Sequence, residues 1–235
     1  MKTPINPPMR LTAGFNTATV DAPLADYPFP EPFHTSNNAL SSTRQSIAEY
    51  VTDFMDSVAE YTVTGLSSTF ALAAANGGAA LLTPGAATTA TSAYKTATML
   101  SIAAGSRFWF QSRFSISAFA TGVSAYVGLQ EAATTTEGLW FAVSQTGVVS
   151  LVSTVGGVPT TLLSNLATMV AGTEIDLALS YNGADLLAFV NGVLTGRATA
   201  PTLSSAVLGP VFQITPTATQ TMTIDFCQAV TEVAR

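Results

Sequence analysis

Hydrophobic and polar positions alternate with a period of two along much of the chain after residue 60. The pattern is clearest in residues 107–117, where Phe108, Phe110, Phe114 and Ile116 fall on one side. A period of two is typical of a β-strand, because successive side chains point to opposite faces of the sheet. These residues therefore predict a strand with one buried face.

Turn sequences separate this strand from other short alternating runs. Asn76-Gly77, Asn182-Gly183 and Asn191-Gly192 are typical of tight hairpins, because both central residues of a type I′ turn need positive φ angles. Strands are predicted at residues 61–65, 69–74, 79–82, 96–102, 107–117, 125–129, 138–144, 148–152, 174–181, 186–190, 193–197, 211–214 and 221–230. About a dozen strands at this spacing predict an all-β antiparallel sandwich over residues 59–235.

The first 40 residues follow a different pattern and contain seven of the twelve prolines. Proline fixes φ and removes a backbone donor, so residues 1–40 are predicted to form an extended arm. Phe15, Tyr27, Phe29 and Phe33 are candidate anchors that would fill pockets on a partner protein. The alternative is a disordered tail with no function.

Residues 41–58 join this arm to the sandwich and allow two structures. Ile47, Tyr50, Val51 and Phe54 have the spacing of one helix face, so a short helix or a linker is predicted. Alternatively, Tyr50 to Phe54 could be the first strand of the sandwich. The sequence leaves this choice open.

Composition and charge limit the classes of partner that the protein is expected to bind. Charged residues make up only 9% of the chain, the net charge is −6, and no Lys/Arg cluster is present. A nucleic-acid partner is therefore not expected, whereas a surface rich in Ala, Thr and Ser is suited to close packing against another protein. No apolar run reaches the roughly 20 residues needed to span a bilayer, and the first residues lack the apolar segment of a secretory signal. We expect assembly in the cytoplasm.

Catalytic chemistry has few candidate residues. The only histidine, His34, lies in the proline-rich arm, so serine or cysteine triads and a zinc site are not expected. Cys227 is predicted to be a small buried residue of its strand. No cofactor or metal is predicted.

Glycoside hydrolysis is the main enzymatic alternative, and it needs two carboxylates that point at the same sugar. Asp176 stands between apolar neighbours, Asp225 has no acidic partner on its own strand, and Glu131 and Glu137 flank a Thr-rich loop. The protein is therefore predicted not to be an enzyme.

Two kinds of binding residue remain. Asn182, Asp185 and Asn191 could contribute oxygens to a calcium site, although turn chemistry also explains both asparagines. Trp109 lies opposite the predicted core face, so we expect it to be exposed or to contact a neighbouring subunit. Trp140 follows Leu139 in an apolar run and is predicted to be core.

Residues 175–198 resemble the most recognisable stretch of laminin G-like and concanavalin A-like jelly-roll sandwiches. In those domains one strand ends at Tyr-Asn/Asp-Gly and its neighbour ends at Val-Asn/Asp-Gly. The matching residues here are Tyr181, Asn182, Gly183, Phe189, Val190, Asn191 and Gly192. The resemblance extends over about residues 60–229 and implies a concanavalin A-like fold.

The start of the domain resembles the decoration, or cement, proteins of tailed-bacteriophage capsids. The residues that carry this likeness are Asp53-Phe54, Tyr61-Thr62-Val63-Thr64, residues 77–83, and Arg107-Phe108-Trp109-Phe110. The resemblance implies a trimeric virion structural protein on the outer surface of the capsid, with the major capsid protein as its partner.

Two functions follow as hypotheses. In the first, the arm and one sandwich face bind the major capsid protein and stabilise the shell. In the second, the domain is a non-catalytic carbohydrate-binding module of a phage fibre or spike, which binds glycans through loops around residues 134–138 and Gly183.

Overall fold

The computed structural model describes residues 46–54, 57–73, 78–85, 90–95, 100–101, 107–131, 137–182, 184–202, 207–217 and 219–233. The arm of residues 1–40 and its anchors Phe15, Tyr27, Phe29 and Phe33 lie outside this part of the chain. Residues Ile47–Glu232 form one compact unit. No helix in the described ranges is long and apolar enough to cross a membrane.

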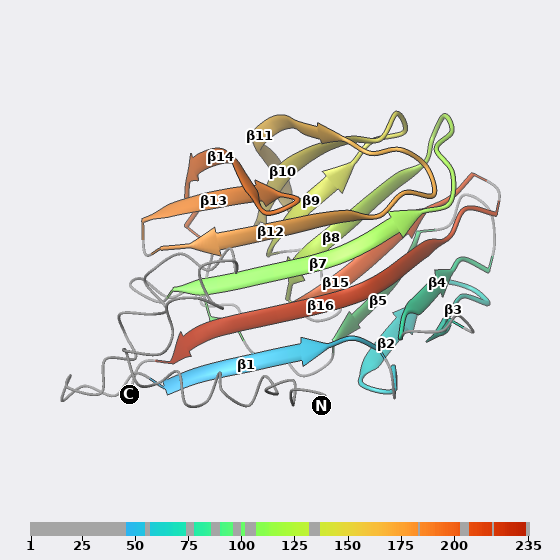
Figure 1. Cartoon of the computed structure of the whole chain (residues 1–235), viewed down its shortest axis with the longest axis horizontal. Helices are drawn as coiled ribbons and strands as arrows, with labels where there is room; N and C mark the ends of the chain where they lie inside the picture. Colours follow the sequence, from blue (N-terminus) through green and yellow to red (C-terminus); the bar gives the residue numbers. More distant parts are fainter. Residues whose placement is uncertain are drawn as a thin grey trace, which may run out of the picture. The chain divides into compact units, whose positions relative to one another are not determined.

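The described residues form two antiparallel sheets that pack face to face (Figure 1). Sheet A has the order β14 (Val193–Thr199), β13 (Asp185–Val190), β12 (Ile175–Tyr181), β7 (Phe108–Ile116), β16 (Met222–Val233), β4 (Ala80–Thr83) and β3 (Thr69–Leu72), and β1 (Ser46–Thr52) also pairs with β16. Sheet B has the order β11 (Val158–Thr168), β10 (Val148–Val155), β9 (Gly138–Val143), β8 (Ser124–Gln130), β15 (Val207–Thr215), β5 (Thr91–Lys95) and β2 (Tyr61–Thr64), and β6 (Leu100–Ser101) pairs with β15. The predicted all-β sandwich is confirmed.

The core lies between the sheets and follows the period-two pattern. Phe108, Phe110, Phe114 and Ile116 of β7 are fully buried on the inner face, as their alternation predicts. Cys227 of β16 is buried on the same side, which confirms its prediction as a small core residue. Inner side chains of both sheets thus exclude water from one continuous apolar layer.

One end of this core is an aromatic cluster formed by Phe54, Tyr61, Phe70 and Phe212. Their ring centroids lie between 5.1 and 6.4 Å apart. Tyr61 and Phe212 come from sheet B, Phe70 comes from sheet A, and Phe54 follows β1. The cluster therefore joins the two sheets.

The Asn191-Gly192 turn has the geometry that its sequence predicts. The φ angles of Asn191 and Gly192 are +48° and +77°, which allows the tight connection of β13 to β14. The Asn191 side-chain Oδ1 also accepts a hydrogen bond from the Asp176 backbone N–H at 3.0 Å. This turn is thereby fixed to the start of β12.

Residues 46–52 form strand β1 rather than the short helix that the spacing allowed. Tyr50 is buried, whereas Val51 on the opposite side is half exposed. Pairing with β16 satisfies the backbone of this segment, and such tertiary pairing overrides a weak helical pattern. The sandwich therefore begins before residue 59.

Two other strand predictions need correction. The sequence pattern does not predict β11, because its apolar and polar positions do not alternate regularly. In the structure its pairing with β10 is irregular, and Asn165 has a φ of +58°. The predicted strand at 96–102 lies mostly outside the described residues; of it, residues 100–101 form the short β6, and β5 precedes it at Thr91–Lys95. The surrounding Ala- and Thr-rich sequence has too little alternation to locate these strands.

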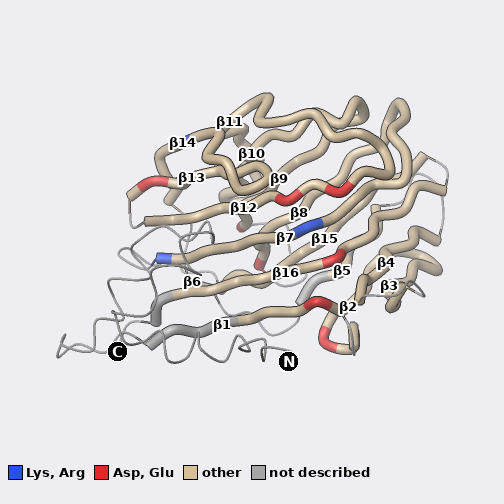
Figure 2. The backbone as a smooth tube through the Cα atoms, viewed as in Figure 1, with Lys and Arg blue, Asp and Glu red and all other residues tan. Residues whose placement is uncertain are grey.

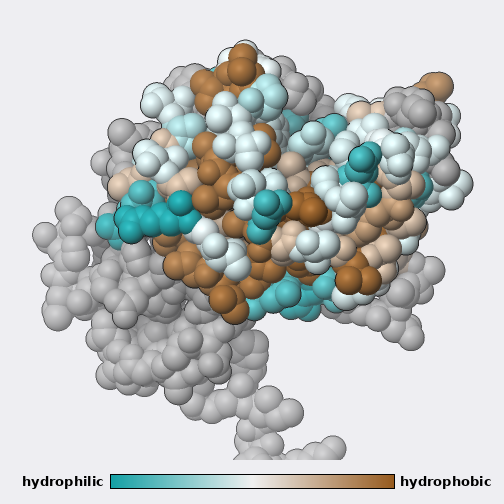
Figure 3. All heavy atoms as spheres, turned by 90° about the horizontal axis from the view of Figure 1, so that it is seen from above, coloured by the Kyte–Doolittle hydropathy of each residue, from teal (hydrophilic) through white to brown (hydrophobic). Residues whose placement is uncertain are grey.

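β11 and β14 are the edge strands at one side of the sandwich, and they pack against each other. The approach is close at Gly196 of β14, where a Cβ atom would lie 2.7 Å from Leu163 Cδ1. This side exposes Val158 (66%), Val193 (64%) and Leu194 (53%). Seen from above, hydrophobic residues lie among neutral and hydrophilic ones on the described surface (Figure 3).

Candidate functional site

Polar side chains gather on the face of sheet A that points away from sheet B. Across the central strands, Asp176 of β12 pairs with Arg113 of β7, and Ala178 pairs with Gln111. Figure 2 shows the result as a positive position on β7 between negative positions on β12 and β16. The second negative position is Asp225, which follows Ile224 in β16.

A β-bulge in β16 adds an aromatic side chain to this face. The pairing of β16 with β7 shifts between Ile224 and Phe226, so one extra residue is inserted. Ile224 and Cys227 are fully buried, whereas Asp225 and Phe226 between them are partly exposed. The bulge therefore turns two successive side chains outward, where a regular strand would bury one of them.

Hydrogen bonds and ion pairs connect the polar members. Gln111 Nε2 donates to both carboxylate oxygens of Asp176, at 3.0 and 2.8 Å. Arg113 Nη1 donates to Asp225 Oδ2 at 3.2 Å, and Arg113 Nη2 lies 3.9 Å from Asp176 Oδ2. One guanidinium thus serves two carboxylates from different strands.

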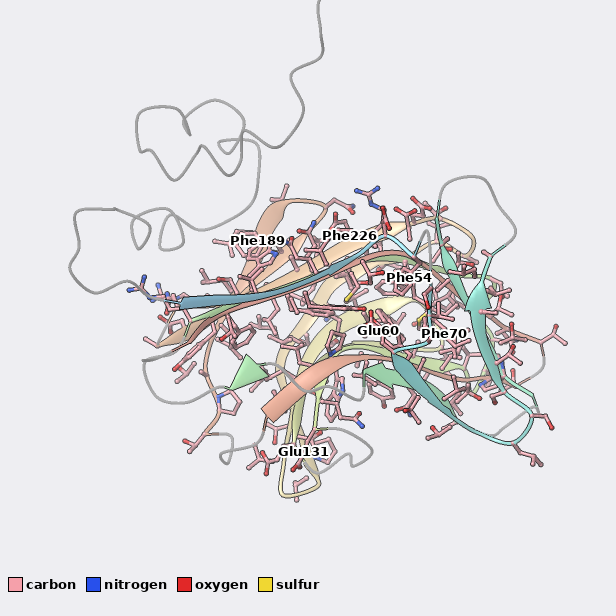
Figure 4. The ribbon with its side chains drawn as sticks, turned by 90° about the horizontal axis from the view of Figure 1, so that it is seen from below. Phe54, Glu60, Phe70, Glu131, Phe189 and Phe226 are labelled. Atoms are coloured by element: carbon pink, nitrogen blue, oxygen red, sulfur yellow. The ribbon has the colours of Figure 1, made fainter. Side chains whose placement is uncertain are left out.

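Phe189 of β13 and Phe226 flank this polar group. In Figure 4 both lie on the outward side of sheet A, while Phe54 and Phe70 lie in the core. Phe189 and Phe226 are half-buried, so each leaves part of a ring accessible. We call the set Gln111, Arg113, Asp176, Asp225, Phe189 and Phe226 the outer-face cluster.

The outer-face cluster is open to solvent to different degrees. The Arg113 side chain is 47% exposed, Asp225 is 31% exposed, and Asp176 is 19% exposed. Burial raises the pKa of the Asp176 carboxyl above its ordinary value of 3.8, although the Gln111 hydrogen bond and the Arg113 charge lower it. Asp176 is therefore a partly desolvated acceptor at the centre of the face.

This raised pKa predicts a pH-dependent stability. Because the folded protein holds the Asp176 proton more tightly than the unfolded chain, its free energy of unfolding falls as pH rises from below 3.8 through the raised pKa. Asp176→Asn removes this titration. The free energy of unfolding of the variant minus that of the wild type should therefore increase over this interval and level off above it.

Urea denaturation at closely spaced pH values measures this difference. Thr223→Ala is a matched control. Thr223 of β16 lies on the same outer face of sheet A as Asp176, and its side chain does not titrate in this range. Its difference from the wild type should stay constant. A constant difference for Asp176→Asn as well would contradict the proposed desolvation of Asp176.

Trp109 occupies the same face but is fully buried, and its ring centroid lies 5.4 Å from that of Phe189. The prediction that Trp109 is exposed is therefore wrong. A side chain with no exposed area also has none to offer a neighbouring subunit. Trp140 is buried as predicted, but it packs with Val211 in a small cluster separate from the main core.

The three calcium candidates use their oxygens in other ways. Asn182 Oδ1 accepts hydrogen bonds from the backbone N–H groups of Ala184 and Asp185, and the Asp185 carboxylate binds Arg197. Asn191 Oδ1 is bound to the β12 backbone. Among the described residues, no group of three or more His, Cys, Asp or Glu side chains could hold a metal ion.

Other predicted residues fall outside the cluster. His34 and the loop residues 132–136 lie outside the described ranges, as does Gly183. Glu137 is buried, and its Oε1 accepts a hydrogen bond from the Gly156 N–H in the turn between β10 and β11. This acid has a structural contact within sheet B.

No protein-family model and no curated protein matches the sequence. Solved structures do match. A protein of unknown function from Shewanella oneidensis MR-1 is 12% identical, with a TM-score of 0.60 over 88% of this chain and 97% of that one. The potassium-bound carbohydrate recognition domain of Emp46p is 13% identical, with a TM-score of 0.55 over 76% of this chain and 94% of that one.

An endo-1,3-beta-glucanase from Streptomyces sioyaensis is also similar. It is 10% identical, with a TM-score of 0.56 over 79% of this chain and 96% of that one. Identities this low establish the fold alone. The chain has the two-sheet antiparallel jelly-roll sandwich of concanavalin A-like lectins and glucanases.

Proposed function

We propose that this protein is a non-catalytic glycan-binding module whose site is the outer-face cluster. The observation that carries the proposal is the position of Gln111, Arg113, Asp176 and Asp225 between two half-buried phenylalanines on an open sheet face. Sugars present hydroxyls that donate and accept hydrogen bonds, and apolar C–H faces that pack on aromatic rings. The cluster provides partners for both.

The sandwich fold supports this proposal, because the similar domain of Emp46p is a carbohydrate recognition domain. The proposed site differs from the loops around residues 134–138 and Gly183 that the sequence analysis favoured. Those loops lie outside the described residues, whereas the outer-face cluster sits on the rigid central strands β7, β12 and β16. Sites on paired strands hold polar groups at fixed spacing.

Binding without hydrolysis fits the chemistry of the two carboxylates. A retaining glycosidase uses one carboxylate as nucleophile and a second, protonated one as acid, about 5 Å apart. Here Asp176 and Asp225 lie on either side of the same guanidinium, and Arg113 contacts one oxygen of each carboxylate on an open sheet face. Such a pair suits hydrogen bonding to a ligand better than proton transfer.

A glycan array probed with the full chain tests this function. We expect retention of a limited set of oligosaccharides, with unchanged ligands after incubation as judged by mass spectrometry. Phe226→Ala should weaken retention, whereas Val193→Ala, at an exposed position on an edge strand, should not. An array on which the full chain retains no glycan would overturn the proposal.

Capsid decoration is a second candidate, favoured by the uncharged part of sheet B. Residues 138–173, which include β9, β10 and β11, contain no charged side chain, as Figure 2 shows. A neutral surface can pack closely on another protein without desolvating charges. The partner would be the major capsid protein, bound by a trimer on the outer surface of the virion.

Deletion of residues 1–40 tests this second candidate. We expect the truncated chain to keep its sandwich, as judged by circular dichroism, and to lose co-sedimentation with phage heads that the full chain shows. Co-sedimentation of both forms would exclude the arm as the anchor. Co-sedimentation of neither would exclude capsid decoration.

A further inference from the structure

We infer that the outer-face cluster selects uncharged glycans and discriminates against anionic ones, such as sialylated, sulfated or uronic-acid-containing glycans. This inference rests on the proposed glycan-binding function and specifies its ligand class. It follows from the balance of charges around Arg113 and from the hydrogen-bonding capacity left on Asp176 and Gln111.

The charge balance of the cluster is negative. Two carboxylates, Asp176 and Asp225, share the single guanidinium of Arg113. Arg197 of sheet A does not offset this charge, because it is bound to Asp185 toward the edge of the sheet. An anionic ligand would therefore meet one more negative than positive charge, on a protein whose net charge is already −6.

Arg113 is poorly placed to capture a ligand carboxylate or sulfate. Arginine binds such groups best when two parallel N–H donors are free to point at them. In this structure Nη1 donates to Asp225, and Nη2 faces Asp176 at 3.9 Å. A ligand anion would have to share the guanidinium with Asp225 and Asp176 and would lie close to both of their negative charges.

The hydrogen-bonding groups that remain available in the cluster suit the neutral hydroxyls of a sugar. Each Asp176 oxygen accepts one hydrogen bond from Gln111 Nε2 and keeps further acceptor capacity. The Gln111 amide also carries an oxygen that accepts from hydroxyl donors. Phe189 and Phe226 add apolar ring surface on either side, and neither interaction requires a charged sugar.

The test uses an array of matched pairs, in which each neutral oligosaccharide is accompanied by a version that carries sialic acid, sulfate or a uronic acid. Binding of the full chain is measured at low ionic strength, where charge effects are strongest. We expect neutral members to bind at least tenfold more tightly than their anionic counterparts. Raising the salt concentration should narrow this ratio.

Asp225→Asn provides the decisive variant, and Asp185→Asn is its matched control. Asp225→Asn removes one negative charge from the cluster, so the anionic-to-neutral affinity ratio should rise about tenfold. Asp185→Asn removes the same charge at the β13–β14 edge, outside the cluster, and should leave that ratio within twofold of the wild type.

The outcomes distinguish a failure of charge selection from a failure of glycan binding. Equal or tighter binding of anionic members by the wild-type chain overturns the charge selection but leaves glycan binding in place. An unchanged ratio in Asp225→Asn also overturns it, because the selection would then not originate in the cluster. If no member of any pair binds, the proposed function fails, and the inference fails with it.

Discussion

Replacing Phe212 with Ala is expected to lower the free energy of unfolding by about 3 to 5 kcal/mol. Phe212 has no exposed area, and its ring centroid lies 6.4 Å from Phe54, 6.0 Å from Tyr61 and 6.3 Å from Phe70. These contacts join strands of both sheets. The variant therefore loses the transfer energy of a buried ring and leaves a cavity that rigid strands cannot close.

Guanidinium denaturation followed by intrinsic fluorescence measures this loss. Val193→Ala is the control, because Val193 is 64% exposed and its truncation should change stability by less than about 0.5 kcal/mol. A loss below about 1 kcal/mol for Phe212→Ala would contradict the packing of this aromatic cluster between the two sheets.

Asp176→Ala is expected to reduce glycan affinity by about 10- to 150-fold, which corresponds to about 1.5 to 3 kcal/mol for a hydrogen bond to a charged group. Asp176 is the central acceptor of the outer-face cluster and also orients Gln111, which donates to both of its oxygens. Its removal takes away the carboxylate and releases the amide that it holds. Isothermal titration calorimetry with an array-selected oligosaccharide measures the effect.

The matched control for this loss is Asp185→Ala, which removes another partly exposed carboxylate of sheet A, at the β13–β14 edge. Its affinity for the oligosaccharide should remain within about twofold of the wild type. Thermal melting of both variants confirms that they are folded. A change of less than twofold for Asp176→Ala would place the glycan site elsewhere.

The fold was largely predictable because most strands alternate clearly. β7 buries Phe108, Phe110, Phe114 and Ile116 on one face, and this pattern alone locates the strand and its inner side. The Asn191-Gly192 turn was likewise predictable, because its φ angles need those residue types. Local sequence determines such features, so they do not depend on the rest of the chain.

Elements without alternation could not be found in this way. β11 is an edge strand with exposed Thr, Ser and Asn side chains and a positive φ at Asn165, so its pattern resembles a loop. β1 has helical spacing, and its strand conformation depends on pairing with β16, which lies at the other end of the sequence. Tertiary pairing decides the structure in both cases.

The outer-face cluster escaped prediction for the same reason. Gln111 and Asp176 are 65 positions apart, and Arg113 and Asp225 are 112 positions apart, so only the strand order brings them together. One signal was available, since Gln111 and Arg113 lie on the polar face of β7. Phe226 gave no such signal, because the bulge that turns it outward depends on the register between β16 and β7.

Trp109 shows that strand alternation alone does not predict whether a side chain is exposed. Alternation correctly places Trp109 on the side opposite Phe108 and Phe110, but it does not reveal that Phe189 from β13 packs against it. A side chain on an outer face is exposed only if no neighbour covers it. The accessible aromatic surface of this face therefore belongs to Phe189 and Phe226.

The location of a bound glycan tests the central claim most directly. A crystal structure of the full chain with an array-selected neutral oligosaccharide is predicted to show the sugar over β7, β12 and β16, with hydroxyls within hydrogen-bond distance of Asp176 and Gln111. A sugar bound instead at the loops around residues 134–138 and Gly183, or on the outer face of sheet B, would contradict this account.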